Sequence, residues 1–213
     1  MAENASSGKG ARTGEIGSVL FHFQSMANPS DLIVCFAPWV MLELNVRAAE
    51  EGGGTWKTAH SRLLYDRRGL GAQALAQADE ITFQLDAVKA RIENLARALP
   101  ALCTVIWGYR MRGEIVTAMS DMGWLRDQLL SVSSLVLGLW DEGPRRAERR
   151  LPPEVLGYYQ RCYPCDATGL ASALEAALQW YEAWLVPRLD ACAIPHSHAF
   201  VQTARDFVSV ASR

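Results

Sequence analysis

The spacing of the apolar residues changes near residue 70, and this change limits the folds open to the chain. Before it, Val40, Leu42 and Leu44 alternate with other residues, as in a half-buried strand. After Gly71 the apolar residues recur at intervals of three and four, as on a helix with one buried face. The longest such stripe is formed by Leu85, Val88, Ile92, Leu95 and Leu99. The pattern predicts an α+β protein, with a small mixed β-sheet followed by a C-terminal helical bundle.

Three regions follow from this change of pattern. Residues 1–14 are rich in glycine, serine and charge and have no apolar stretch, so we expect a disordered tail. Residues 15–80 are expected to form the sheet region and residues 81–213 the helical bundle domain. The expected strands are "SVLFHF", "DLIVCF", "WVMLELNVR" and "HSRLLYD", with Pro38 in the turn between the second and third strands and "DRRG" as the closing turn.

Prolines and capping residues divide the helical region. Thr82 is expected to cap a helix over residues 82–99, and Pro100 to begin the next, because proline is tolerated in the first turn of a helix. Two further helices are expected to begin at Pro152–Pro153 and just after Asp166 or Thr168. The helix expected over residues 112–137 should pack on the 82–99 helix. The expected buried faces, in chain order, are Ile115, Met119, Met122, Leu125 and Leu129; Leu170, Leu174, Ala177, Tyr181 and Leu185; and Phe200, Ala204, Phe207 and Ala211.

Charge and cysteine usage exclude several classes of protein. With 21 basic and 23 acidic residues the net charge is −2, so no basic field favours nucleic acid. The longest apolar run, residues 33–42, is too short to span a bilayer, and the first residues do not resemble a secretory signal. Five cysteines, an odd number, suggest reduced thiols. We therefore expect a cytoplasmic protein with no nucleic-acid or membrane partner.

A set of loose motifs resembles one family. These motifs are "HSRLLYDRRG" at residues 60–69, "RGE" at 112–114, "LRDQLL" at 125–130 and "RRAERRLPPE" at 145–154. In this order they resemble the small-molecule nucleotidyltransferases, including those that modify aminoglycoside and lincosamide antibiotics. The resemblance covers about residues 31–185. It implies a sheet that carries the chemistry, a helical domain that binds the acceptor and often dimerises, and Mg²⁺ with a nucleoside triphosphate as cofactors if the protein is active.

The metal motif of that family is incomplete in this chain. The family pattern is Gly-Ser, about a dozen residues and then Asp-x-Asp, and it holds two metal ions. Here Asp31 follows Gly17-Ser18 at that distance, but Ile33 occupies the second carboxylate position. Two alignments are possible. In the first, Gly17-Ser18 and Asp31 are a decayed form of the motif. In the second, the motif is absent and Glu43 matches the third carboxylate of the family. The second alignment is favoured because residues 31–66 are too few for the usual intervening elements. The expected metal ligands are Asp31 and Glu43, and Glu43 is also the expected catalytic residue. Under both alignments the metal site is incomplete, so nucleotidyl transfer should be impaired or absent.

The resemblance also implies an acceptor-binding surface on the helix that follows "RGE". Its expected residues are Arg112, Glu114, Thr117, Asp121 and Trp124, where an aromatic ring beside carboxylates would suit a cationic ligand. The same polar stripe also fits a solvated helix face, with Glu114 paired to Arg110 four residues before it. The basic run "RRAERR" is expected to be a solvated loop, because acidic residues are interleaved with it.

Other interpretations of the sequence stay open. Cys162 and Cys165 form C-x-x-C, and with Cys192, His196 and His198 they suggest a zinc site, although free thiols are the simpler interpretation. Three functions are compatible with the sequence. The chain is a nucleotidyltransferase-like protein, a non-catalytic ligand-binding or dimerisation module, or a helical enzyme that acts on an apolar small molecule. A homodimer is expected, with surface aromatic residues Trp140, Tyr158, Tyr159 and Trp180 as interface candidates.

Overall fold

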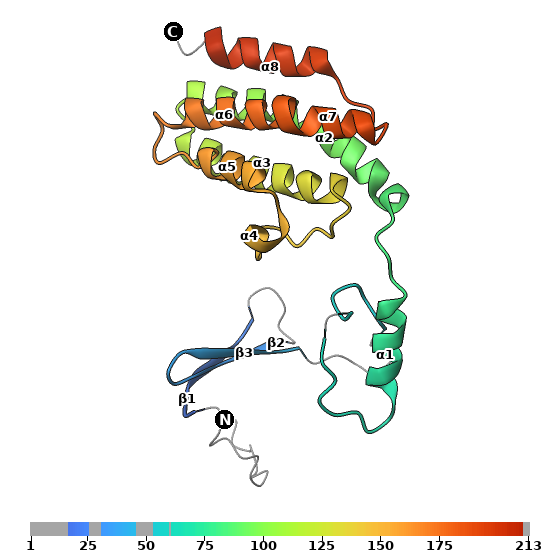
Figure 1. Cartoon of the computed structure of the whole chain (residues 1–213). Helices are drawn as coiled ribbons and strands as arrows, with labels where there is room; N and C mark the ends of the chain where they lie inside the picture. The colour runs from blue at the N-terminus through green and yellow to red at the C-terminus, as the bar shows by residue number, and fades with distance from the viewer. Residues whose placement is uncertain (1–16, 26–30, 46–52, 60, 211–213) are drawn as a thin grey trace. The chain divides into compact units, whose positions relative to one another are not determined.

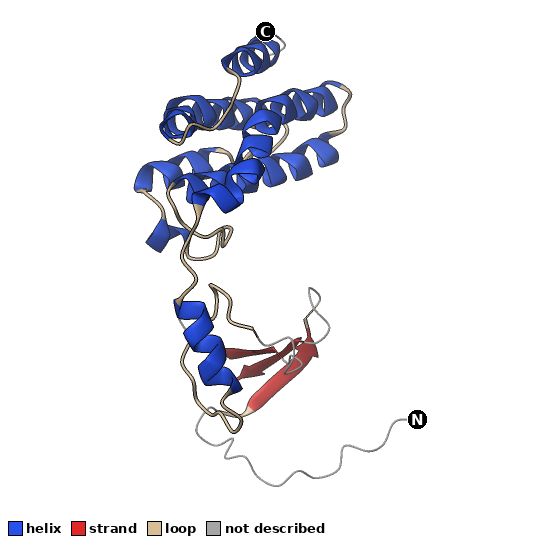
Figure 2. Ribbon diagram, turned by 90° about the vertical axis from the view of Figure 1, so that its right-hand side faces the viewer, coloured by secondary structure: helices blue, strands red, loops and turns tan. Residues whose placement is uncertain are grey.

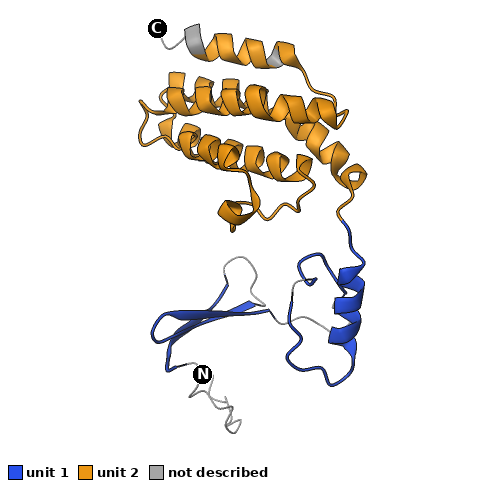
Figure 3. Ribbon diagram, in the orientation of Figure 1, with its two compact units in different colours: residues 1–82 blue, residues 83–213 orange. Residues whose placement is uncertain are grey.

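A computed structural model describes residues 17–25, 31–45, 53–59 and 61–210. The chain divides into two compact units, residues 1–82 and residues 83–213 (Figure 3). The expected tail at residues 1–14 lies outside the described residues.

Unit 1 contains a three-stranded antiparallel sheet in the order β1-β2-β3 (Figure 1). The strands are β1 (Val19–Gln24), β2 (Asp31–Phe36) and β3 (Val40–Asn45). Pro38 lies in the turn between β2 and β3, as predicted, and the peptide bond between Ala37 and Pro38 is cis. The α+β class is confirmed. All three strands run antiparallel rather than in the mixed arrangement expected, because the short connections between them suit antiparallel neighbours.

The expected strand "HSRLLYD" is wrong for its described residues, 61–66, which form an irregular segment before α1 (Leu70–Asp79). The side chain of Asp66 gives the physical reason. Its Oδ2 accepts a hydrogen bond from the backbone N–H of Ala72 at 2.8 Å, and its Oδ1 accepts one from Arg68 at 3.2 Å. These bonds, led by the one from Ala72, lower the pKa of Asp66. Asp66 therefore fixes the turn "DRRG" against the start of α1.

Among the described residues of unit 2, the regular elements are all helices, joined by loops and turns (Figure 2). Its longest helices, α2 and α3, pack against each other as predicted from their apolar faces. None of the described helices has the length and apolar character needed to cross a membrane. The elements are α2 (Leu85–Met111), α3 (Ile115–Val136), α4 (Ala147–Arg150), α5 (Pro153–Arg161), α6 (Leu170–Gln179), the π-helical η3 (Trp180–Leu185), α7 (Val186–Ala191) and α8 (His198–Val210).

The sequence-based helix boundary at Pro100 is wrong, because α2 runs through this proline without a break. A proline inside a helix lacks the N–H that would bond to the carbonyl four residues earlier, here that of Ala96. The hydroxyl of Tyr181 donates a hydrogen bond to this Ala96 carbonyl. Tyr181 is buried, which raises its pKa to about 12. A side chain 85 positions away in the sequence thus satisfies the group that Pro100 leaves open. The expected cap Thr82 also lies before the true N-cap residue, Gln84.

The buried faces of α3 and α6 follow the sequence prediction closely, whereas that of α8 does not. On α3, Met122, Leu125 and Leu129 are buried. The expected face of the segment from α6 to η3, Leu170 to Leu185, is buried throughout. Among the described side chains of α8, Ala204 is buried as predicted, Val201 and Val208 are buried as well, and Phe207 is 47% exposed. The side chain of Phe200 and residue Ala211, also expected on this face, are not described. The face of α8 is therefore rotated from the expected one, so that small and β-branched residues contact α2 and α6.

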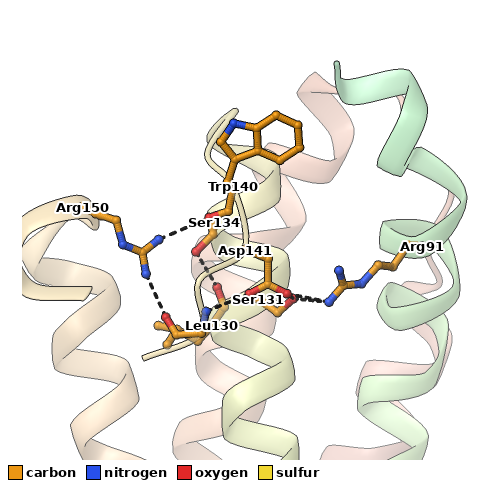
Figure 4. A network of polar contacts seen from close by, with 8 residues as sticks. Arg91, Leu130, Ser131, Ser134, Trp140, Asp141 and Arg150 are labelled. Atoms are coloured by element: carbon orange, nitrogen blue, oxygen red, sulfur yellow. Dashed lines mark hydrogen bonds and ion pairs between the residues drawn. The ribbon is translucent and has the colours of Figure 1, made fainter. Parts of the chain in front are cut away.

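A polar network holds the connection between α3 and α5 (Figure 4). Asp141 Oδ2 accepts hydrogen bonds from Arg91 Nη2 and from Ser131 Oγ, each at 2.6 Å. Although partial burial acts to raise the pKa of Asp141, the hydrogen bonds from Ser131, Gly143 and Arg91 together lower it. Arg150 donates to the carbonyls of Trp140, Gly143 and Arg145. The run "RRAERR" is therefore not wholly a solvated loop, because it contains α4 and the largely buried Arg150 side chain.

Candidate functional site

Asp31 and Glu43 lie on the same face of the sheet in unit 1. Asp31 pairs with Asn45 across β2 and β3, and Ile33 pairs with Glu43 two positions further along β2. Residues directly opposite each other share a face, and every second residue of a strand returns to it. The two carboxylates are thus diagonal neighbours, and Leu42 and Leu44 face the other side, as predicted.

The two carboxylates have different surroundings. Asp31 is buried at 6% exposure. With its amide oriented to donate, Asn45 gives hydrogen bonds to both carboxylate oxygens of Asp31, at 2.8 and 3.0 Å. Glu43 is exposed, and its carboxylate makes no hydrogen bond or ion pair with the part of the chain that the structure describes. The Asp31 carboxylate therefore stabilises the pairing of β2 with β3. Glu43 is the better placed of the two carboxylates to bind a ligand.

The sheet does not assemble a two-metal centre from its described residues. Nucleotidyl transfer with two Mg²⁺ ions requires several carboxylates that converge on the metals. Among residues 17–25, 31–45, 53–59 and 61–210, one group of three or more histidine, cysteine or acidic side chains lies close enough to share a metal ion. That group is Asp190, His196 and His198 in unit 2. Asp31 and Glu43 alone do not fit the Mg²⁺–triphosphate group that the family resemblance implies.

The expected acceptor-binding residues lie at the start of α3 in unit 2. Arg112 Nε donates to Glu114 Oε1 at 2.7 Å, so the partner of Glu114 is Arg112 and not Arg110. Thr117 is exposed, Asp121 is half-buried and Trp124 is 50% exposed. They share one side of α3, but this side belongs to unit 2 and Glu43 to unit 1. The sequence also predicts that the stripe of Glu114, Thr117 and Asp121 faces a cleft toward which Glu43 points, and this stays a prediction.

Arg110 contributes to the packing of unit 2. Its guanidinium lies 4.4 Å from the centre of the Trp107 ring. It also donates a hydrogen bond to the Ala167 carbonyl at 3.3 Å. Arg110 thereby joins α2 to the loop before α6, which explains why it does not reach Glu114.

A cluster of aromatic and charged residues joins α3 to α5, and sequence reasoning missed it. Tyr159 donates its hydroxyl hydrogen to Asp127 Oδ1 at 3.1 Å. The guanidinium of Arg126 lies 3.7 Å from the centre of the Tyr163 ring and 4.9 Å from that of Tyr159. Burial, reinforced by the contact with the Tyr163 hydroxyl, raises the pKa of Tyr159. The i, i+4 spacing of the two tyrosines was a signal for a shared helix face, but nothing in the sequence paired it with α3.

This cluster borders a pocket of about 280 Å³. The pocket combines a carboxylate and an amide with two phenol rings and an apolar wall. Its lining residues are Pro144, Ala147, Glu148, Leu156, Tyr159, Gln160 and Tyr163. Such a mixture suits a small polar or cationic molecule.

The aromatic residues expected at a dimer interface pack within the chain. Trp180 is fully buried, so its assignment to the surface is wrong. Tyr158 stacks on it with ring centres 6.2 Å apart, and Tyr159 meets it edge-on at 6.4 Å. Trp140 packs edge-on against Phe83 at 5.3 Å. The homodimer itself stays a prediction.

The expected zinc site with cysteine ligands does not form among the described residues. None of the five cysteines is in a disulfide bond, and that they are metal-free thiols stays a prediction. Cys162 is buried near Cys103, and burial raises the pKa of the Cys162 thiol to about 12, whereas Cys165 is exposed. His196 and His198 do lie together, but their acidic neighbour is Asp190 and not a cysteine.

No known protein-family model matches the sequence, and no curated protein is similar to it at a significant level. The candidate sites therefore rest on the residues and the geometry of the chain itself.

Proposed function

We propose that this chain is a nucleotidyltransferase-like protein of the small-molecule-modifying type that binds a small ligand and transfers nucleotide poorly or not at all. The order of a small sheet followed by helices is consistent with this class. The observation that carries the proposal is the pair of sheet carboxylates. Asp31 is engaged by Asn45, which leaves Glu43 as the exposed carboxylate on that face. One such group does not hold two metal ions against a triphosphate.

The pocket beside Tyr159 supports the ligand-binding part of the proposal. Asp127, which accepts the Tyr159 hydrogen bond, follows Trp124 by three residues on α3, so the two are near neighbours on the helix surface. The expected stripe of Asp121 and Trp124 thus leads toward this pocket. Glu148 adds a second carboxylate, and the tyrosine hydroxyls offer hydrogen-bonding groups. A cationic, polyhydroxylated molecule such as an aminoglycoside matches these groups in charge and polarity.

Calorimetric titration of the full chain with an aminoglycoside tests this binding. We expect saturable binding, and the variants Glu148→Gln and Asp121→Asn should each weaken it by about tenfold, because each removes one charge-assisted contact. Glu175→Gln on the exposed side of α6 is the matched control and should leave the affinity unchanged. The absence of saturable binding at millimolar concentration, or equal losses in all three variants, would contradict the proposed ligand class.

A further inference from the structure

The segment between α7 and α8 brings together three side chains that the sheet chemistry does not use. Asp190 lies in the last turn of α7, and His198 is the first residue of α8. Between them, Ala193 adopts a left-handed conformation with φ of 51°, and the Ile194 N–H bonds back to the Leu189 carbonyl at 2.9 Å. The chain therefore turns sharply after α7. One ligand atom from each of Asp190, His196 and His198 lies within 4.8 Å of the other two.

The orientation of His196 is fixed by its surroundings. Its side chain is only 5% exposed. Its Nδ1 lies 3.1 Å from the carbonyl oxygen of Ile194. A carbonyl oxygen only accepts, so Nδ1 carries the hydrogen and donates it, and Nε2 holds the free lone pair. This is the arrangement in which a backbone carbonyl orients a metal-binding histidine.

The free lone pair of His196 points at other metal-ligating atoms. Its Nε2 lies 3.3 Å from Nε2 of His198 and 3.6 Å from Oδ1 of Asp190. A deprotonated Nε2 and a carboxylate oxygen are both acceptors, so their approach is unfavourable unless a cation or a proton lies between them. Metal–ligand distances of about 2.0–2.2 Å at a tetrahedral angle separate neighbouring ligand atoms by about 3.3–3.5 Å. The two observed separations fall close to this range.

The positions of these residues are poor choices for helix stability alone. Asp190 lies at the C-terminal end of the continuous run formed by α6, η3 and α7, where the helix dipole disfavours a negative charge. His198 stands at the start of α8, where a positive charge is disfavoured. A bound cation would compensate Asp190 directly. The three residues also border a cavity of about 410 Å³, lined in addition by Ala193, Ile194 and Pro195, which leaves room for a further ligand on the metal.

We propose that Asp190, His196 and His198 form a binding site for a divalent transition-metal ion, with Zn²⁺ as the ion that best suits two imidazoles and one carboxylate. Three protein ligands leave a fourth position open toward the cavity. Imidazole nitrogen favours Zn²⁺ over Mg²⁺, so this site is distinct from any Mg²⁺ chemistry at Glu43. The metal would also link α7 to α8 and so stabilise the last helix of unit 2.

Calorimetric titration of the chelator-treated full chain with zinc chloride tests the site. We expect one Zn²⁺ per chain, an increase in melting temperature on Zn²⁺ addition, and no response to Mg²⁺. The variants Asp190→Asn and His198→Ala should each weaken Zn²⁺ binding by at least about tenfold, since each removes a ligand. His22→Ala on β1 is the matched control. Cobalt absorption in the visible range gives an independent readout of the ligand geometry in the same proteins.

Two results would overturn the proposal. The first is no Zn²⁺ binding by the wild-type chain at micromolar concentration. The second is binding that persists in Asp190→Asn and His198→Ala but is lost in Cys165→Ser, which would assign the metal to the thiols. Both ligand variants replace exposed side chains, so melting curves measured in chelator should match the wild type and separate loss of metal from loss of folding.

Discussion

Replacing Trp180 by alanine should reduce the free energy of unfolding of unit 2 by about 3–5 kcal/mol, the range for deletion of a large buried aromatic side chain. Trp180 is fully buried and its ring is covered by Tyr158 and Tyr159. Urea unfolding followed by far-ultraviolet circular dichroism measures the effect, because the helical signal comes mainly from this unit.

The matched control for this experiment is Trp180→Phe. The Nε1 atom of Trp180 is buried and makes no hydrogen bond among the described residues, so phenylalanine removes ring volume without breaking a polar contact. The loss should therefore be clearly smaller than for alanine. If Trp180→Ala lowered the stability by less than about 1 kcal/mol, the indole would lie at the surface, where the sequence-based interface prediction had placed it.

Replacing Tyr181 by phenylalanine should cost about 1–3 kcal/mol of stability, because it leaves the buried Ala96 carbonyl without its donor. The companion variant Pro100→Ala supplies a backbone N–H to the same carbonyl. We therefore expect the cost of Tyr181→Phe to be smaller in the Pro100→Ala background, and a double-mutant cycle in urea measures the difference. An equal cost in both backgrounds would mean that the hydroxyl does not compensate for the proline.

The apolar periodicity of the sequence was sufficient to predict the strands β2 and β3, the helix α3 and the buried face from Leu170 to Leu185. These elements depend on local pattern: alternation for strands and spacings of three and four for helices. The turn at Pro38 was predictable for the same reason, since proline in a strand region favours a break in the pairing.

The failures have in common that a specific side-chain contact or tertiary packing, and not the apolar pattern, decides the local structure. Pro100 ends a helix by local rules, yet Tyr181 allows α2 to continue. Residues 61–66 have the composition of a strand, but the carboxylate of Asp66 binds the amides at the start of α1 instead. On α8 Ala204 is buried as predicted, but the large Phe207 was also expected inside, whereas the smaller Val201 is buried in the helix that packs against α2 and α6.

In the candidate sites too, features that depend on local pattern were predictable from the sequence, and features that depend on contacts between segments were not. The sequence correctly placed Glu43 on the other face of the sheet from Leu42 and Leu44, because strand alternation is a local property. It did not reveal that Asn45 engages Asp31, which depends on strand register. It singled out His196 and His198 but paired them with cysteines, because the turn at Ala193 that brings Asp190 to them has no glycine to mark it.

A turnover assay tests most directly the proposal that the sheet lacks the carboxylates needed for nucleotidyl transfer. Purified protein is incubated with Mg²⁺, labelled ATP or GTP and a panel of aminoglycosides and lincosamides, beside the variant Glu43→Gln. Loss of a metal-bridging carboxylate should slow the reaction about a thousandfold or more. We therefore expect no labelled product above background from either protein. Robust turnover by the wild type that disappears in Glu43→Gln would contradict the claim and show that another carboxylate completes the site.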